Sequence, residues 1–239
     1  MVDNTKFGPT VLAIGLFAGL SVLGYLLADA AIRFKAFERS VTVKGLSERE
    51  YPADIVIWPI QFSTASNDLE ALYRQIDLGI EKTTAFLEGS GIRGEEISYS
   101  SPTIIDKSAR PYGERSDAEF RYAATQIVTV YSQDIETARN LMRKTSELGK
   151  QGLALTGDDY QSQVEYVFTR LNDVKPEMIE ESTTKAREVA EKFSADSRST
   201  LGKIKRASQG QFSISARDKN NPHIKQVRVV STVTYYLSD

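Results

Sequence analysis

The chain has 239 residues, of which 41% are hydrophobic and 26% are charged, and its net charge at pH 7 is −2. This composition is typical of a globular protein and provides no basic surface for nucleic acid. The chain has no cysteine and one histidine, which excludes disulfides and thiolate chemistry and argues against a transition-metal site.

The first element is an apolar stretch, residues 7–28, which reads FGPTVLAIGLFAGLSVLGYLLA and lies between Lys6 and Asp29. About 20 apolar residues in a helix span the hydrocarbon core of a bilayer. We predict a short tail over residues 1–6, an uncleaved transmembrane anchor over residues 7–31 and a stalk over residues 32–39. A signal peptide cleaved near Ala28-Asp29-Ala30 is the main alternative. A buried core helix fits least well, because the stretch has no polar face.

Within this stretch Gly15 and Gly19 form a G-x-x-x-G pattern. Two glycines one helical turn apart let membrane helices approach closely, so we predict that this face packs against a second helix. The alternative is that glycine is simply frequent in membrane helices. Bilayer lipid is the first partner that this segment implies.

The charges that flank the stretch bear on its orientation in the membrane. Four cations follow it, whereas Lys6 precedes it: Arg33, Lys35, Arg39 and Lys44. The positive-inside rule then favours a cytoplasmic C-terminal domain, although long domains translocate largely regardless of charge.

The next elements are two strands, over residues 40–45 and residues 54–64. In the second, alternation places Trp58, Ile60 and Phe62 on one face. Pro59 cannot donate to a sheet ladder, so we predict an edge strand or a bulge there. An unpaired edge is a ready pairing site, and these three residues are predicted to form a subunit-interface strand.

A helix follows over residues 67–87, with Asn67 as its cap, and then a strand over residues 96–105 and a charged loop over residues 106–117. The pattern continues with further strands and two more helices, one capped by Asp134 and one by Asn172 or Asp173. Pro176 is placed in the first turn of the last helix, and Gly202 is predicted to end it. The remaining predicted strands cover residues 118–131, 152–155, 163–171, 203–213 and 226–237. The last of these is also predicted to offer a free edge.

This order of elements predicts an α+β fold behind the transmembrane helix. Many strands alternate, which is typical of sheets with one face on helices and one face in water. We predict two-layer α/β sandwich subdomains with ferredoxin-like βαβ units in mostly antiparallel or mixed sheets. Two intertwined subdomains would share residues 40–239.

Motifs for catalysis are weak. Residues 145–151 (TSELGKQ) lack the first glycine of a phosphate loop and end a helix where that motif begins one. Ser182 and Lys185 match S-x-x-K, but its partner motifs are absent and the serine sits in a helix. We interpret both as structural.

Two further candidates remain. His223 follows Asn221 and Pro222 in a loop and lacks the G-x-S-x-G elbow of a hydrolase. Asp158 and Asp159 could offer oxygens to a cation, but turn chemistry explains them better. We therefore predict no catalytic residue, no cofactor and no metal ligand, and we expect that the chain is not an enzyme.

The segment VTVKGLSEREYPADIVIW, residues 41–58, resembles the SIMPL-domain family: a first strand that ends in V-x-G, an acidic E-x-E turn, and A-D opening the second strand. The resemblance continues through residues 91–98 (GIRGEEIS), residues 122–134 (YAATQIVTVYSQD) and the helix around residues 185–193. It covers residues 40–237. The order of these motifs carries more weight than any one of them.

The resemblance implies an extracytoplasmic bacterial protein of undefined biochemical function. Members are mostly periplasmic or envelope proteins, some are linked to oxidative-stress defence, and at least one forms large ring-like or channel-like homo-oligomers. The family has no agreed catalytic residues. This chain departs from many members by retaining a long apolar segment in place of a cleaved signal.

Three functional hypotheses follow. The first is a self-assembling structural or interaction protein, anchored once in the bacterial inner membrane with most of its chain in the periplasm. The second is a periplasmic ligand-binding module with a pocket between the two subdomains. The third, an enzyme, needs a cluster of titratable groups that the sequence does not show.

Overall fold

The computed structural model describes residues 7–37, 39–109, 119–157 and 163–238. Within these ranges the chain forms five α-helices and ten strands, and the strands make two sheets. The prediction of an α+β fold behind an N-terminal apolar helix is confirmed. Contacts divide the chain into two compact units. Unit 1 comprises Met1–Glu48, Pro176–Phe212 and Arg228–Asp239, and unit 2 comprises Arg49–Lys175 and Ser213–Val227. Each unit is therefore assembled from segments that are distant in the sequence.

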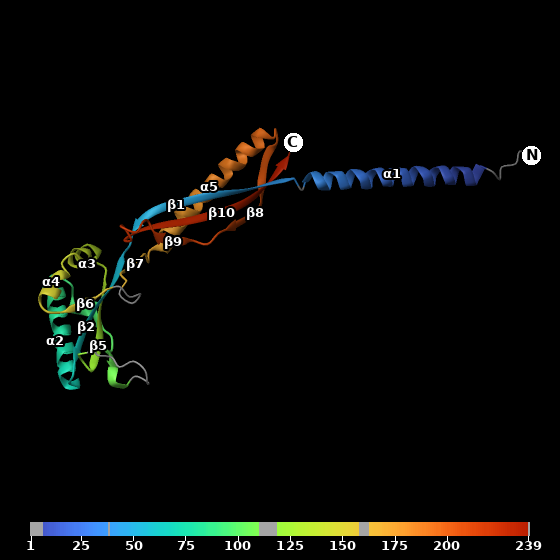
Figure 1. The fold of residues 1–239 in the computed structure, drawn as a ribbon. Coiled ribbons are helices and arrows are strands. Elements are labelled where there is room, and N and C mark those ends of the chain that lie inside the picture. Colours follow the sequence, from blue (N-terminus) through green and yellow to red (C-terminus); the bar gives the residue numbers. More distant parts are fainter. Residues whose placement is uncertain (1–6, 38, 110–118, 158–162, 239) are drawn as a thin grey trace, which may run out of the picture. The chain divides into compact units, whose positions relative to one another are not determined.

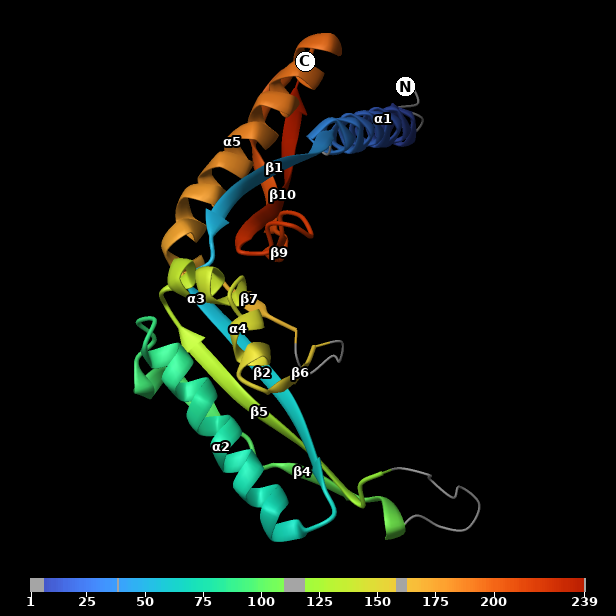
Figure 2. The ribbon, with the colours of Figure 1, turned by 60° about the vertical axis from the view of Figure 1, so that its left-hand side comes forward.

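Unit 1 contains helix α1 (Phe7–Phe37) and a sheet covered on one face by helix α5 (Leu171–Asp196), as Figures 1 and 2 show. The strands lie in the order β1 (Ser40–Pro52), β10 (Ile224–Ser238), β8 (Thr200–Gln209). Strand β9 (Ser213–Ala216), whose residues belong to unit 2, also pairs with β10. Helix α5 buries a stripe of mostly small residues at four-residue spacing: Met178, Ser182, Ala186, Ala190 and Ser194. Small side chains on this face allow the helix to lie close to the sheet.

The closest approach is at Gly45 of β1. A Cβ atom there would lie 1.9 Å from the carbonyl oxygen of Ser182 and 2.4 Å from the backbone nitrogen of Ala186. Beside this contact the hydroxyl oxygens of Ser182 and Ser231 lie 2.6 Å apart, and both side chains are buried. Strand β1 and helix α5 thus meet backbone to backbone, which only glycine permits.

Unit 2 contains the larger sheet. Its strands lie in the order β3 (Ile97–Tyr99), β5 (Tyr122–Ser132), β2 (Ile55–Ser66), β6 (Ala154–Thr156); β4 (Thr103–Asp106) also pairs with β5, and β7 (Glu165–Val167) with β2. Three helices pack on it: α2 (Leu69–Glu88), α3 (Ile135–Met142) and α4 (Ser146–Lys150). Short 3₁₀ turns cover Gly94–Glu96 and Lys107–Ala109. The core joins apolar residues of the two long strands to the helices, and it includes Val56, Val128, Val130, Leu87, Ala138, Leu141 and Leu148.

The prediction that residues 54–64 form an edge strand is wrong. Strand β2 pairs with β5 on one side and with β6 and β7 on the other. Pro59 pairs with Thr129 of β5 on one side, and on the other side it lies, among the described residues, in a gap between the residues paired with β7 (Ile55–Ile57) and those paired with β6 (Gln61–Ser63). A proline can therefore stand inside a central strand here.

The predicted subunit interface on this strand is wrong for the same reason. The side chains of Trp58, Ile60 and Phe62 are exposed by 5%, 3% and 2%, because they form the core of unit 2. They have no surface to offer to another subunit. The last strand, β10, is also central, since it lies between β1 and β8.

The ends of the helices differ from the predictions at several points. Asp68, not Asn67, caps α2 by accepting the N–H of Ala71 at 2.7 Å, whereas Asp134 caps α3 as predicted. Helix α5 begins at Leu171, so Pro176 lies inside the helix rather than in its first turn. The helix ends at Asp196, before the predicted stop at Gly202.

Candidate functional site

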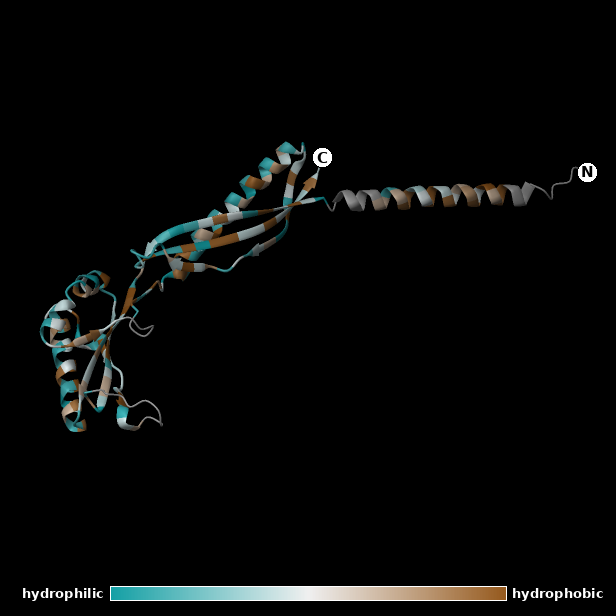
Figure 3. Cartoon of the chain, viewed as in Figure 1, coloured by the Kyte–Doolittle hydropathy of each residue, from teal (hydrophilic) through white to brown (hydrophobic). Residues whose placement is uncertain are grey.

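Helix α1 is the most distinctive surface of the chain. Figure 3 shows its apolar colouring, and Val11–Ala31 is long and apolar enough to cross a membrane, as a signal sequence also would be. None of that span is buried, and its large apolar side chains are exposed from 53% at Leu23 to 76% at Phe17. Nothing lies within 4 Å of a Cβ built on Gly15 or Gly19. The predicted packing face is thus open on the helix.

The serine and lysine of the S-x-x-K match have structural partners. Ser182 is buried, and its hydroxyl donates to the carbonyl of Ile179 and contacts Ser231. Lys185 pairs with Glu181 one turn away on the exposed side of α5. A nucleophile needs access and a nearby base. Ser182 is buried, and its hydrogen-bond partners are a carbonyl and a hydroxyl rather than a base, which supports the structural interpretation.

The structure describes the phosphate-loop match at residues 145–151. Residues 145–151 include helix α4, and Thr145 donates its hydroxyl to the carbonyl of Met142, so no open phosphate loop forms there. Asp158 and Asp159 lie outside the described residues. Among the residues that the structure describes, no group of three or more His, Asp or Glu side chains could hold a metal ion.

The single histidine lies in a polar contact inside unit 2. His223 Nε2 lies 3.1 Å from a guanidinium nitrogen of Arg139, and the ring of Tyr166 meets the imidazole edge-on at 6.0 Å. Its Nδ1 is buried and has no hydrogen-bond partner within the described ranges. Burial, then Arg139 and Arg217, lower the pKa of His223, against the opposing charge of Asp218. The imidazole is therefore held neutral, with Nε2 accepting from Arg139.

Asp54 forms a second polar centre, for which the sequence motifs predicted no role. Its carboxylate accepts the backbone N–H of Thr169 at 2.9 Å, the hydroxyl of Thr169 at 3.0 Å and Nε of Arg170 at 3.2 Å. The backbone of Ala53 donates to the carbonyl of His223, and that of Asp54 to Val167. The A-D pair thus joins the start of β2, the chain entering α5 and the loop before β10. Its place in the family-like segment was the only signal of this role in the sequence.

Unit 2 also carries a shallow groove of about 400 Å³ between helix α2 and strand β3. The hydroxyls of Thr84 and Tyr99 lie 3.1 Å apart across it. Its lining is acidic and partly apolar: Asp77, Ile80, Glu81, Thr84, Ala85, Glu88 and Tyr99. Such a lining would suit a basic group, and it lacks the apolar enclosure of a small-molecule pocket.

Comparison with known families gives one match. The family model described as SIMPL, a protein of unknown function (DUF541), matches residues 41–235, which is most of the chain. No curated protein matches the sequence significantly. The match begins just after helix α1 and ends within β10, so it covers the folded parts of both units.

Proposed function

Because the chain belongs to the SIMPL family, whose function is undefined, we propose on structural grounds that it is a single-span membrane protein of the structural and interaction type, which assembles with copies of itself in the bacterial envelope. It lies in the inner membrane with the SIMPL domain in the periplasm. A contribution to envelope integrity or oxidative-stress defence is the role that its family resemblance suggests.

The observation that carries this proposal is the bare apolar surface of α1. The span Val11–Ala31 has 21 residues, and at 1.5 Å per residue its length is about 32 Å, close to the hydrocarbon thickness of a bilayer. It is longer than the apolar region of about 7–15 residues in a signal peptide. Lipid removes this surface from water, which no described part of the chain does.

Self-assembly is supported by two features. Gly15 and Gly19 leave a smooth face on α1, where a second helix can pack. In unit 1, strand β8 pairs with β10 and has no partner on its other side within the described ranges. Its cations Lys203, Lys205 and Arg206 oppose pairing of β8 with its own copy, so a contact through this edge joins unlike surfaces. Repeated head-to-tail contacts form a ring where the rotation between copies closes, as in the ring-like homo-oligomer that the family resemblance implies for at least one member.

The test is the mass of the full-length chain in nanodiscs or mild detergent, measured by mass photometry. We expect a discrete oligomer that persists on dilution. A monomer at every protein concentration would contradict self-assembly. Extraction of the chain from membranes by alkaline carbonate would separately contradict the anchor.

Ligand binding is the second candidate, and the acidic groove on α2 is the observation that favours it. The carboxylates of Asp77, Glu81 and Glu88 would attract a cationic group that stacks on Tyr99. Titration with a basic peptide, monitored by the chemical shifts or fluorescence of tyrosine, should saturate if the groove binds. A response unchanged in Glu81→Gln would exclude this groove.

A further inference from the structure

We infer that one end of unit 1 docks onto the anionic phospholipid headgroups of the bilayer that holds α1. This end, here called the basic rim, comprises Arg39, Arg198, Lys203 and Lys205, with Phe193 and Tyr236 beside them. The inference rests on the proposed anchoring of α1, and it adds a second membrane contact that the anchor alone does not require.

Chain length places the basic rim close to the bilayer. Helix α1 continues from the end of the apolar span at Ala31 to Phe37, a rise of about 9 Å. Arg39 follows two residues later, at most about 7 Å further along an extended chain. The polar headgroup layer is itself about 5–8 Å thick on each side. Arg39 is thus at most about 16 Å from the end of the apolar span, which keeps it within about 10 Å of the headgroup layer.

Contacts within unit 1 gather the rest of the rim around Arg39. Its guanidinium donates to the hydroxyl of Ser199 at 3.4 Å, and its carbonyl accepts the N–H of Leu237 at 2.9 Å. Strand β8 starts at this end, because Leu201 pairs with Leu237. The end of β10 and the turn after α5 therefore lie at the tethered end of the unit (Figure 2).

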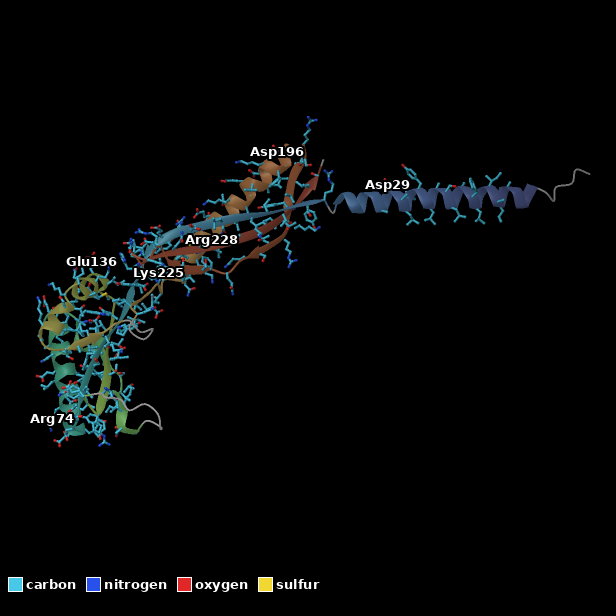
Figure 4. The ribbon with its side chains drawn as sticks, in the orientation of Figure 1. Asp29, Arg74, Glu136, Asp196, Lys225 and Arg228 are labelled. Atoms are coloured by element: carbon cyan, nitrogen blue, oxygen red, sulfur yellow. The ribbon has the colours of Figure 1, made fainter. Side chains whose placement is uncertain are left out.

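The charge of this end is mostly positive, with Asp239 following Ser238 in the sequence. From residue 197 to residue 216 the sequence has four cations and no carboxylate: Arg198, Lys203, Lys205 and Arg206. Asp196, labelled at the tip of α5 in Figure 4, is the acidic residue that precedes them. Cations near an anionic bilayer surface strengthen association by about fivefold each.

Exposed aromatic side chains accompany these cations. Phe193, in the last turn of α5, is 55% exposed, and Tyr236 is 40% exposed with the ammonium of Lys205 5.3 Å from its ring centre. Aromatic and basic side chains together are typical of the membrane interface, where the ring lies among headgroups and the cation meets phosphate. An exposed phenylalanine ring in water makes no such contacts with headgroups.

The backbone at Arg198 is an independent observation. The N–H of Ser199 bonds to the carbonyl of Ser194 at 2.8 Å and the N–H of Arg198 to Ala195 at 3.1 Å, which is a Schellman turn at the end of α5. Arg198 has a φ of 54°, a left-handed conformation that this position normally gives to glycine. Glycine would be less strained than arginine at this position. A strained residue points to a role for its side chain.

The experiment uses the full-length chain in nanodiscs. Since the chain has no cysteine, Ala195→Cys provides a unique site for a donor dye at the tip of α5, with an acceptor dye on lipid headgroups. We expect higher energy transfer in bilayers containing phosphatidylglycerol than in pure phosphatidylcholine, and loss of the difference in about 0.5 M salt. Equal transfer in both bilayers would overturn the inference.

Substitutions distinguish an effect of charge on docking from an effect on folding. Arg198→Glu with Lys203→Glu should lower the ratio of docked to undocked protein by about 30-fold or more. Lys144→Glu with Lys219→Glu, the same charge change on exposed sites of unit 2, should leave it unchanged. Arg198→Gly removes the cation and relieves the backbone, so it should weaken docking while raising the melting temperature. Weaker docking with a lower melting temperature in Arg198→Gly, or no effect of the first pair, would overturn the inference.

Failure of the anchor is distinguishable from failure of docking. If alkaline carbonate extracts the chain, the proposed anchoring fails and the docking that rests on it fails too. If the chain resists extraction and the dye pair does not respond to lipid charge, the anchor stands and the basic rim has no lipid role.

Discussion

At the scale of single residues, Gly45 shows how one position sets the distance between a helix and a sheet. The neighbours of a new Cβ are backbone atoms of α5, which cannot rotate away. We expect Gly45→Ala to lower the free energy of unfolding by about 3 kcal/mol or more, because overpacking a close contact costs about 1–3 kcal/mol even where side chains can adjust. Thermal unfolding measures this.

The control for Gly45 is Gly157→Ala, since a Cβ at Gly157 meets nothing within 4 Å. That change should alter stability by less than about 0.5 kcal/mol. Equal effects of the two substitutions would show that the approach of β1 to α5 is looser than the structure has it.

Asp54 provides a prediction about charge-assisted hydrogen bonds. Removal of its carboxylate leaves the N–H of Thr169 and the guanidinium of Arg170 without this acceptor. We expect Asp54→Ala to destabilise the protein by about 2–3 kcal/mol in chemical denaturation. Asp77→Ala, an exposed carboxylate on α2, should cost less than about 0.5 kcal/mol. A small loss in Asp54→Ala would mean that water replaces the carboxylate.

His223 gives a prediction about pH. Its folded pKa lies below the value of 6.5 for an unperturbed histidine, so below that pH the unfolded chain binds a proton that the folded chain does not. The free energy of unfolding should therefore fall as pH decreases through about 6.5 and level off below the folded pKa.

The measurement for His223 is the melting temperature between about pH 8 and about pH 5 in wild type and in His223→Gln, which keeps a neutral acceptor for Arg139. The wild type should lose more stability on acidification than the variant does. Parallel curves would show that His223 protonates equally in the folded and unfolded chain.

At the scale of elements, periodicity predicted most helices and strands of this chain but not which strands are neighbours in a sheet. Residues 54–64 alternate as a strand should, and the structure has β2 there, yet Pro59 suggested an edge where there is a gap in a central ladder. The order of strands depends on which distant segments pair, and no local pattern carries that information. The alternation that suggested an interface at Trp58 was the pattern of the core.

Helix α5 shows a second limit of local signals. Glycine is the usual sign of a helix end, so Gly202 was predicted to stop it. The actual Schellman turn has Arg198 in the glycine position, and that choice hides the turn from a search for glycine. Asp54 was hidden similarly, since its partners Thr169 and Arg170 lie far along the chain.

The glycine face of helix α1 gives a prediction about self-association. Gly15→Ile with Gly19→Ile should raise the dissociation constant for self-association of α1 by about tenfold, or about 1.4 kcal/mol, because branched side chains hold the helices apart. Gly24→Ile is the matched control on the same helix, where a Cβ also meets nothing within 4 Å. Mass photometry in nanodiscs would measure this change in self-association. An equal effect of Gly24→Ile and of the Gly15→Ile, Gly19→Ile pair would exclude the G-x-x-x-G face.

At the scale of the whole molecule, segments of the two units alternate along the sequence, because the first and last strands of the chain pair. Strand β1 follows α1 directly, yet its partner β10 is the last strand of the chain. The sequence placed both as strands and could not place them side by side. This pairing brings Arg39 to Leu237 and Ser199, and so creates the basic rim from four segments.

The basic rim bears on the orientation of the whole chain. The cations after α1 favour a cytoplasmic domain, whereas the proposed envelope role requires a periplasmic one. If these cations bind headgroups, lipid binding explains their position next to α1, and the cations need not indicate which side of the membrane the domain is on. The rule is also a bias that long translocated domains override. We therefore expect alkaline phosphatase fused after Asp239 to be active in a bacterial host and a fluorescent reporter of the cytoplasm to be dark.

A matched variant makes this orientation test sharper. Asp3→Lys with Asn4→Lys adds positive charge before α1, which strengthens retention of the amino terminus in the cytoplasm. Phosphatase activity should then stay the same or rise. If the wild type is inactive and this variant becomes active, the charges after α1 decide the topology and the native domain is cytoplasmic. Docking of the basic rim would survive that result, since it depends on lipid charge and not on the side of the membrane, whereas the periplasmic assignment would not.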